Sequence, residues 1–202
     1  MTRPDAVVFD IGNVLLGWNP EAFYDGLIGA ARRQALFAAV DLDGMNARID
    51  RGAPFVPTVQ AMRDAHPEWA AEIQIWQDRW IEMLTPVIDD SVTALYALKQ
   101  RGVPVFALSN FGVQTFDWAR TRFEVLQAFD MVFISGHLQL MKPEPEIYAA
   151  LEQGTGMAGA QLFFIDDKPE NIAAARARGW QGHVFSDPAA LRADLARLDL
   201  LA

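Results

Sequence analysis

The sequence predicts an α/β protein with a Rossmann-like parallel sheet, helices on both faces of that sheet, and an inserted helical cap domain. Two observations predict it: short apolar runs of strand length alternate with helical patterns, and one long early stretch contains helical patterns only. Strands buried on both faces of a parallel sheet show nearly continuous apolar residues. Four such runs are AVVF (6–9), VPVFAL (103–108), MVFI (131–134) and LFFI (162–165), and GHVF (182–185) is a weaker fifth.

Helical patterns separate the later strands. In SVTALYALKQRG (91–102), apolar residues recur at helical spacing and the closing glycine is placed to end the helix. The segments 145–154 and 169–179 each begin with proline and end with glycine, the usual asymmetry of helix ends. From about residue 90 onward, strand and helix therefore alternate as in a doubly wound α/β domain.

The stretch from residue 18 to about 88 interrupts this alternation. It shows no convincing strand, and it holds three tryptophans, with Trp18 at its entrance. We therefore expect residues 1–17 and 88–202 to form the core and residues 18–87 to form a helical cap, with hinges near 17–20 and 85–89. Helical patterns within the cap are expected at 20–39, 57–65 and 68–84.

Composition narrows the class of protein. The formal net charge is −9 and no run of basic residues occurs, which argues against a nucleic-acid partner. The absence of cysteine excludes disulfides, thiolate metal sites and cysteine nucleophiles. No apolar run approaches the ~20 residues that cross a bilayer, and the N-terminal segment lacks the apolar stretch of a signal peptide. We expect a cytoplasmic protein, monomeric or homodimeric, with no membrane partner.

Polar residues follow the predicted strands where each strand ends. Asp10 follows the first, Ser109 and Asn110 the second, Ser135 the third, and the Asp166–Asp167 pair the fourth. In an open parallel sheet, ligands bind at the carboxyl ends of the strands. These side chains are therefore expected at a common ligand site.

Four segments together resemble the haloacid dehalogenase-like hydrolase superfamily, whose members are mostly magnesium-dependent phosphatases. They are FDIGNVL, LSN (108–110), LMKPEPEIY (140–148) and FFIDDKPENI (163–172), in the order and approximate spacing of that family. The helical stretch lies where this superfamily carries a cap domain. FDIGNVL followed by a tryptophan, and KPEPEIY, are most similar to the subgroup of α-D-glucose-1-phosphatase-type sugar-phosphate phosphatases.

The resemblance implies a role for each matched residue in the hydrolysis of a small phosphorylated metabolite. Asp10 would attack phosphorus and form a transient aspartyl-phosphate. Lys142 and a bound Mg²⁺ would offset the crowded negative charge, and Ser109 with the backbone around Asn110 would bind the phosphoryl oxygens. Trp18 would help to select the substrate.

The same resemblance implies a metal-ligand set. Asp10, Asp166 and the carbonyl of Gly12 would hold Mg²⁺, which prefers oxygen ligands. Asp167 would act through water or orient Lys142, or alternatively cap the helix that begins near Pro169. Asn171 would reach back into the metal shell, or alternatively lie on the helix surface.

Gly12 departs from the family pattern, because related phosphatases usually carry a second aspartate two residues after the nucleophile as general acid and base. Three explanations remain open: a leaving group that needs little protonation, a substitute group from the cap or a metal-bound water, or no phosphatase activity. A metal-independent 2-haloacid dehalogenase, which also lacks this acid, is one alternative, although the acidic pair in IDDKPEN suits a metal site better. A non-catalytic binding protein with the same fold is the other.

Overall fold

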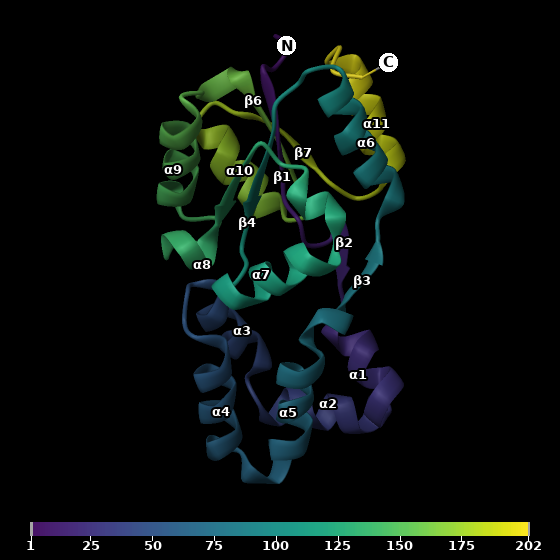
Figure 1. Cartoon of the computed structure of the whole chain (residues 1–202), viewed down its shortest axis with the longest axis vertical. Coiled ribbons are helices and arrows are strands. Elements are labelled where there is room, and N and C mark those ends of the chain that lie inside the picture. Colours follow the sequence, from purple (N-terminus) through teal and green to yellow (C-terminus); the bar gives the residue numbers. More distant parts are fainter. Residues whose placement is uncertain (1, 202) are drawn as a thin grey trace.

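The computed structural model describes residues 2–201 and contains a five-stranded sheet (Figure 1). The strand order is β5-β4-β1-β6-β7, and all neighbouring strands are parallel. Its strands are β1 (Ala6–Phe9), β4 (Val105–Ser109), β5 (Met131–Ile134), β6 (Leu162–Asp166) and β7 (Gln181–Val184). All five predicted strands are present, with ends shifted by at most two residues, and the weakest prediction forms an edge strand.

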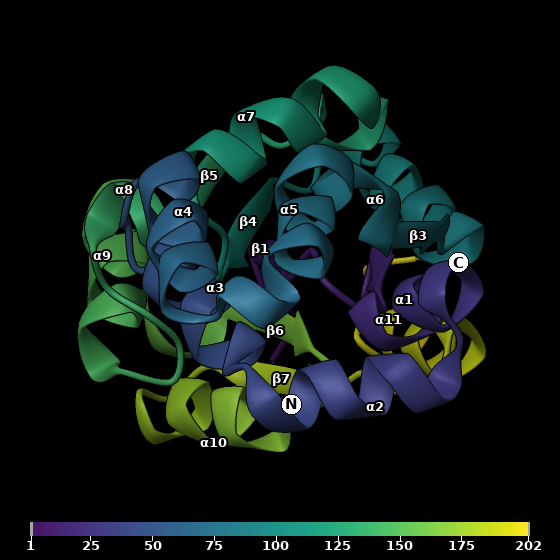
Figure 2. The same ribbon diagram turned by 90° about the horizontal axis from the view of Figure 1, so that it is seen from below.

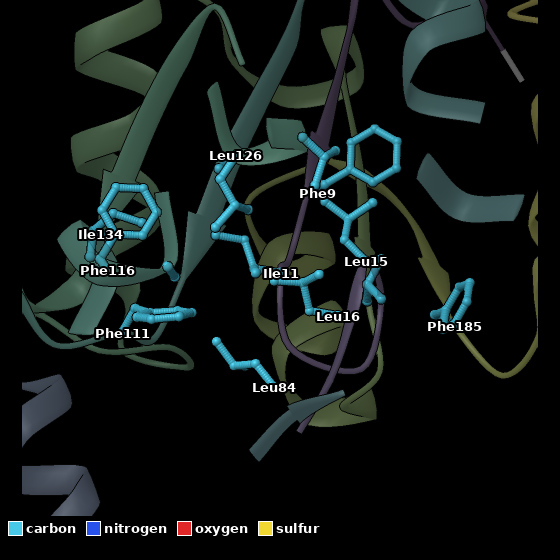
Figure 3. Packing of buried hydrophobic residues seen from close by; sticks show 14 of the residues in the cluster. Phe9, Ile11, Leu15, Leu16, Leu84, Phe111, Phe116, Leu126, Ile134 and Phe185 are labelled. Carbon is cyan, nitrogen blue, oxygen red and sulfur yellow. The ribbon is translucent and has the colours of Figure 1, made fainter. Parts of the chain in front are cut away.

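Two layers of side chains bury the sheet, because successive residues of a strand point to opposite faces. Val7 and Phe9 belong to a cluster that includes residues of α6 (Asp89–Gln100), α7 (Val113–Arg122) and α11 (Pro188–Arg197). Ala6 and Val8 belong to a second cluster with residues of α9 (Pro145–Thr155) and α10 (Pro169–Ala177). Figure 3 shows part of the first layer around β1. The expected α/β class, with helices on both faces, is confirmed.

Five helices form an insertion beyond the carboxyl end of β1. They are α1 (Pro20–Ile28), α2 (Ala30–Ala39), α3 (Leu42–Asp50), α4 (Phe55–Ala65) and α5 (Ala70–Arg79), with short 3₁₀ turns η1 (Pro67–Trp69) and η2 (Trp80–Met83). Viewed from below, α3, α4 and α5 lie in front of the ends of the central strands (Figure 2). Apolar residues of the insertion share one cluster with the sheet, so the two parts pack continuously.

Four expectations about the insertion are corrected. The single helix expected at 20–39 is two helices, because Gly29 adopts a φ of 79° that breaks the helix. The helix expected at 68–84 is shorter, because α5 spans only Ala70–Arg79 between the 3₁₀ turns η1 and η2, and the helix α3 was not predicted. The segment was expected to lack strands, yet β2 (Leu16–Trp18) and β3 (Leu84–Val87) form an antiparallel pair at the expected hinges.

This strand pair is unusually close at one point. A Cβ on Gly17 would lie 2.5 Å from the carbonyl oxygen of Thr85, so only glycine fits there without displacement. The division of the chain into a core (1–17 and 88–202) and a cap (18–87) stays a prediction.

The remaining short elements are η3 (Glu124–Gln127), α8 (Ser135–Leu138) and η4 (Gly159–Gln161). The sequence GTGMAG (154–159) spans the end of α9 and the first residue of η4, so this glycine-rich segment follows a helix and precedes β6. Across residues 2–201, no helix combines the length and the apolar character that crossing a membrane requires.

Candidate active site

A buried lysine joins two carboxylates at the carboxyl edge of the sheet. Lys142 Nζ lies 2.8 Å from Asp10 Oδ1 and 2.6 Å from Asp166 Oδ2. The strand register explains the meeting, because Phe9 of β1 pairs with Ile165 of β6 and the next residue on each strand is an aspartate. The loop before α9 supplies the lysine. Three residues from distant parts of the sequence therefore converge as expected.

Asp10 keeps one oxygen free of protein donors. Its Oδ1 accepts hydrogen bonds from the Ile11 amide and the Ser109 hydroxyl, both at 2.7 Å, and it also faces Lys142. No described residue donates to Oδ2. Burial raises the pKa of Asp10 to about 6; the Lys142 ammonium opposes this and the Asp166 charge adds to it.

Lys142 is nevertheless charged. Burial disfavours the ammonium, but Asp10 and Asp166 more than compensate, so the pKa of Lys142 lies above its usual value. Its backbone is also fixed. Asn110 Oδ1 accepts from the Lys142 amide at 2.8 Å, and Asn110 Nδ2 donates to the Lys142 carbonyl at 3.0 Å. The Asn110 side chain is thus engaged in holding the lysine, and substrate binding by the backbone around Asn110 stays a prediction.

Asp166 is the most fully bonded carboxylate of the site. Its Oδ1 accepts from the Lys168 amide at 2.8 Å, and Asn171 Nδ2 lies 2.9 and 3.0 Å from its two oxygens. Asn171 is buried, so the alternative that it lies on the helix surface is wrong. In this structure its amide group orients Asp166.

Asp167 does not cap α10. The N-cap residue is Lys168, whose own side chain makes no capping hydrogen bond. Instead Asp167 Oδ2 accepts from Asn13 Nδ2 at 3.1 Å. Asn13 in turn accepts from the Trp18 amide at 2.9 Å through Oδ1, which connects the acidic pair to the start of the insertion.

Three carboxylates are close enough to share a cation. Asp10, Asp166 and Asp167 each offer one oxygen, and these oxygens all lie within 4.8 Å of one another. Carboxylate oxygens are hard donors, the type that Mg²⁺ binds through one or two carboxylates plus water and phosphate. The donor set therefore fits a magnesium ion.

Ser135 behaves differently from the other polar residues at the strand ends. Its hydroxyl donates to the Asp50 carbonyl at 2.5 Å and accepts from the Phe111 amide at 2.8 Å. Its side chain is fully buried and is not among those that line the cavity at the site. The expectation that it joins the ligand site is wrong, because the hydroxyl connects the core to the insertion instead.

A cavity of about 420 Å³ lies between this edge and the insertion. Asp10, Gly12, Ser109 and Lys142 are on its core side. Trp18, Trp80 and Phe111 supply an aromatic part, and the Trp18 and Trp80 rings are 5.5 Å apart. Trp18 thus lies where the sequence analysis expected it, at the wall of the site. The other residues along the wall are Asn13, Asp43, Asn46, Ala47, Asp50, Leu84, Asn110, Met141, Asp167, Lys168 and Asn171.

Sequence reasoning missed one face of α3. Asp43, Asn46, Ala47 and Asp50 line the cavity, and their spacing of three, four and seven residues places them on one side of a helix. A polar stripe of this period within the insertion is the signal that could have found them. Lys168, also missed, lines the opposite wall.

Asp50 has an unusual electrostatic setting. Asn46 Nδ2 donates to its Oδ2 at 2.8 Å. Burial raises the pKa of Asp50 to about 7; the Gly112 backbone and Lys168 oppose the rise, and the Asp10 charge adds to it. The cavity therefore holds a carboxyl group whose pKa is shifted from the acidic range toward neutral pH.

An α/β sheet with acidic residues, a lysine and a hydroxyl at its carboxyl edge, beneath a helical insertion, is typical of a class of hydrolases. The family model for haloacid dehalogenase-like hydrolases matches residues 4–179. The chain belongs to that family.

Curated relatives resemble only part of the chain. A sesquiterpene phosphatase, astK, from Aspergillus oryzae is 32% identical over 104 residues, which are 52% of this chain and 53% of the relative. An (S)-2-haloacid dehalogenase from Pseudomonas fluorescens is 29% identical over 92 residues, which are 46% of this chain and 40% of the relative. The matches therefore span about half the length of these relatives or less.

Solved structures match nearly the whole chain. A HAD family enzyme from Bacteroides thetaiotaomicron superposes with a TM-score of 0.72 at 24% identity, covering 92% of this chain and 95% of that one. The same enzyme in complex with magnesium and inorganic phosphate gives a TM-score of 0.70 at 24% identity, with 91% and 94% covered. At this level of identity the likeness establishes the shared fold.

Proposed function

We propose that the protein is a magnesium-dependent phosphatase that hydrolyses a small phosphate monoester, with a sugar phosphate as the preferred class. The observation that carries the proposal is the hydrogen bonding of the Asp10 carboxylate. One of its carboxylate oxygens is held by Ser109, Ile11 and Lys142, and the other is free of protein donors. Asp10 lines the cavity together with three further carboxylates, Asp43, Asp50 and Asp167.

Asp10 is the nucleophile in this proposal. Its bonded oxygen fixes the carboxylate plane, so that the free oxygen can attack phosphorus and form an aspartyl-phosphate. Lys142 stays charged beside it and stabilises the negative charge of the transferred phosphoryl group, with Ser109 nearby. Water then attacks the phosphorus of the intermediate, which releases inorganic phosphate and restores the Asp10 carboxylate.

Magnesium would be held by Asp10, Asp166, Asp167 and the Gly12 carbonyl, with Asn171 orienting Asp166. When bound, the ion offsets the repulsion between these carboxylates and a phosphate dianion. The Bacteroides enzyme that shares this fold has been solved with magnesium and phosphate together, which supports the proposal. The match to a phosphatase among the curated relatives also supports it.

The wall of the cavity favours a hydroxylated leaving group. Asp43, Asn46 and Asp50 offer acceptors for hydroxyl groups, while Trp18 and Trp80 offer ring faces for C–H groups. No lysine or arginine from the described part of the insertion lines the cavity, so a second phosphate or carboxylate on the substrate would lack a partner there. A purely apolar isoprenoid chain would leave the polar α3 face unpaired.

A metal-independent 2-haloacid dehalogenase is the second candidate. It is favoured by the partial match to such an enzyme and by glycine at position 12. Against it, a 2-haloacid carries a carboxylate, which would meet Asp43 and Asp50 on the insertion side and Asp167 on the core side. Three carboxylates with oxygens within 4.8 Å of one another also suit a reaction that uses a metal ion better than one that does not.

The test is a substrate screen with purified protein. Hydrolysis of p-nitrophenyl phosphate and of a panel of sugar phosphates, anomeric ones included, is expected in Mg²⁺ and lost in EDTA. Asp10→Asn should abolish it. Chloride release from 2-chloropropionate in EDTA would favour the dehalogenase. A folded protein that is inactive on both substrate classes would favour a non-catalytic binding protein.

A further inference from the structure

We propose that Asp50, on α3 of the insertion, is the general acid and base of the reaction and supplies the proton that the residue at Gly12 cannot supply. This inference rests on the proposed phosphatase function. It concerns a residue that no family motif in this chain includes, and it assigns a catalytic role to the insertion.

The placement of Asp50 is the first support. It lies on the face of α3 that lines the cavity, together with Asp43, Asn46 and Ala47, and Asp10 lines the same cavity from the core side. A proton donor for the leaving oxygen must face the nucleophile across the scissile bond. Glycine at position 12 has no side chain, and a Cβ built there meets no atom within 4 Å, so the space beside the nucleophile is open.

The second support is that the chain around Asp50 is fixed to the core. Ser135 Oγ, at the end of β5, donates to the Asp50 carbonyl at 2.5 Å. The Phe55 amide donates to Gln114 Oε1 on α7 at 2.6 Å, and Arg51 forms an ion pair with Glu144. The backbone that carries the carboxyl group is therefore held in place relative to the sheet, and catalysis requires such positioning.

Close backbone approaches add to this fixation. A Cβ on Gly52 would lie 2.7 Å from the Gly136 carbonyl oxygen, and one on Gly112 would lie 2.6 Å from Ile49 Cγ2. Both contacts join the C-terminal end of α3 to the core, at Gly136 of α8 directly after β5 and at Gly112 between β4 and α7. Ser135, which the sequence suggested as part of the ligand site, acts here by holding Asp50.

The charges around Asp50 suit a group that must give and take a proton. The Asp10 charge favours the neutral acid, whereas Lys168 and the Gly112 backbone favour the carboxylate. The other charged groups that line the same cavity are Asp43, Lys142 and Asp167. Burial raises the pKa of Asp50 to about 7, close to the pH at which such catalysis is most effective.

In this proposal Asp50 donates a proton in the first step of the reaction and takes one back in the second. In the first step Asp10 forms a bond to phosphorus, the bond from phosphorus to the leaving oxygen breaks, and that oxygen takes the proton of Asp50. In the second step water attacks the same phosphorus and gives a proton to the Asp50 carboxylate, and the bond to Asp10 breaks. Asp10 ends as a carboxylate and Asp50 as an acid, ready for another cycle.

The experiment compares Asp50→Asn with wild type on two substrates that differ in the need for a proton. One is p-nitrophenyl phosphate, whose leaving group departs as a stable phenolate, and the other is the alkyl or sugar phosphate that wild type hydrolyses fastest. We expect kcat/KM of Asp50→Asn to fall about 10²–10⁴-fold on the alkyl ester and less than about tenfold on the aryl ester. Asp78→Asn, an exposed carboxylate on α5 outside the cavity, is the matched control and should leave both unchanged.

An equal loss on both substrates, or no loss on either, would overturn the role of Asp50 while leaving the phosphatase function intact. A wild-type protein without turnover on either substrate would overturn both proposals together. Should Asp50→Asn fail to fold, the pH profile of wild type decides. With Asp50 as acid, kcat/KM for the alkyl ester falls above pH about 7 more steeply than for the aryl ester, and parallel profiles contradict the assignment.

Discussion

Replacement of Lys142 by methionine tests the charge arrangement at the centre of the site. The side chain is 1% exposed, and the two carboxylates that it joins are 10% and 0% exposed. Removing one partner of a buried ion pair costs about 3–5 kcal/mol, because the remaining charge stays buried and uncompensated. Asp10 and Asp166 keep their other hydrogen bonds, to Ser109 and Asn171 respectively, so the expected loss is about 3 kcal/mol.

The pH dependence of this loss has a defined sign. Without the ammonium, burial and mutual repulsion hold the folded-state pKa of Asp10 further above its ordinary 3.8 than in wild type. A carboxyl with a raised folded-state pKa contributes stability at low pH that disappears as the pH rises through that pKa. The deficit of Lys142→Met should therefore be small near pH 4 and grow toward pH 8.

Urea unfolding in EDTA, at several pH values, measures the free energy of unfolding. Lys99→Met is the matched control, because Lys99 pairs with Asp130 at a similar 2.6 Å but through side chains that are 31% and 44% exposed. Its loss should stay below about 1 kcal/mol. The reasoning is refuted if Lys142→Met loses no more than this control at pH 7.5, or if its deficit does not change with pH.

Three further predictions concern stability and positioning. At pH 8, Asp50→Asn should be more stable than wild type by roughly 1–4 kcal/mol, and at pH 4 the two should be nearly equal. The reason is that the pKa of Asp50 is about 7 in the folded protein against 3.8 ordinarily. Equal urea midpoints of the two proteins at both pH values would contradict this. Asn110→Ala removes both hydrogen bonds to the Lys142 backbone, so it should lower kcat on p-nitrophenyl phosphate at least about tenfold without unfolding the protein. An unchanged kcat would show that the lysine is held by other means. Gly17→Ala should lower stability by about 1–3 kcal/mol in thermal unfolding, since its Cβ would meet the Thr85 carbonyl. Gly26→Ala in α1 should be neutral or stabilising, because a Cβ there meets nothing within 4 Å. A Gly17→Ala protein more stable than Gly26→Ala would exclude the close contact.

The sheet was predictable because burial on both faces leaves a simple trace in the sequence. A central strand is apolar along its length, and polar residues come only where it ends. This pattern was enough to predict that Asp10, Ser109 and Asp166 lie at the ends of their strands. Parallel pairing then brings these ends together without further information. The meeting of Lys142 with both carboxylates rested on the family resemblance, since a lysine in a loop carries no periodic signal.

The insertion was less predictable for physical reasons. Its polar stripe on α3 acquires meaning only when the opposite wall is known, and Asp50 lies forty residues from Asp10. The β2–β3 pair is short and its second strand is largely exposed, so it leaves no clear alternation. Gly29 looks like any helix glycine in the sequence, and only its backbone angle shows that it ends α1.

The most direct test of the account is to trap the covalent intermediate. Turnover of the best substrate in Mg²⁺ would be stopped by rapid acid quench, and peptide mass spectrometry would locate any added phosphoryl group. The account predicts phosphorylation of the peptide that contains Asp10, and none in Asp10→Asn. A phosphoryl group on another residue, or continued hydrolysis by Asp10→Asn at the wild-type rate, would contradict it.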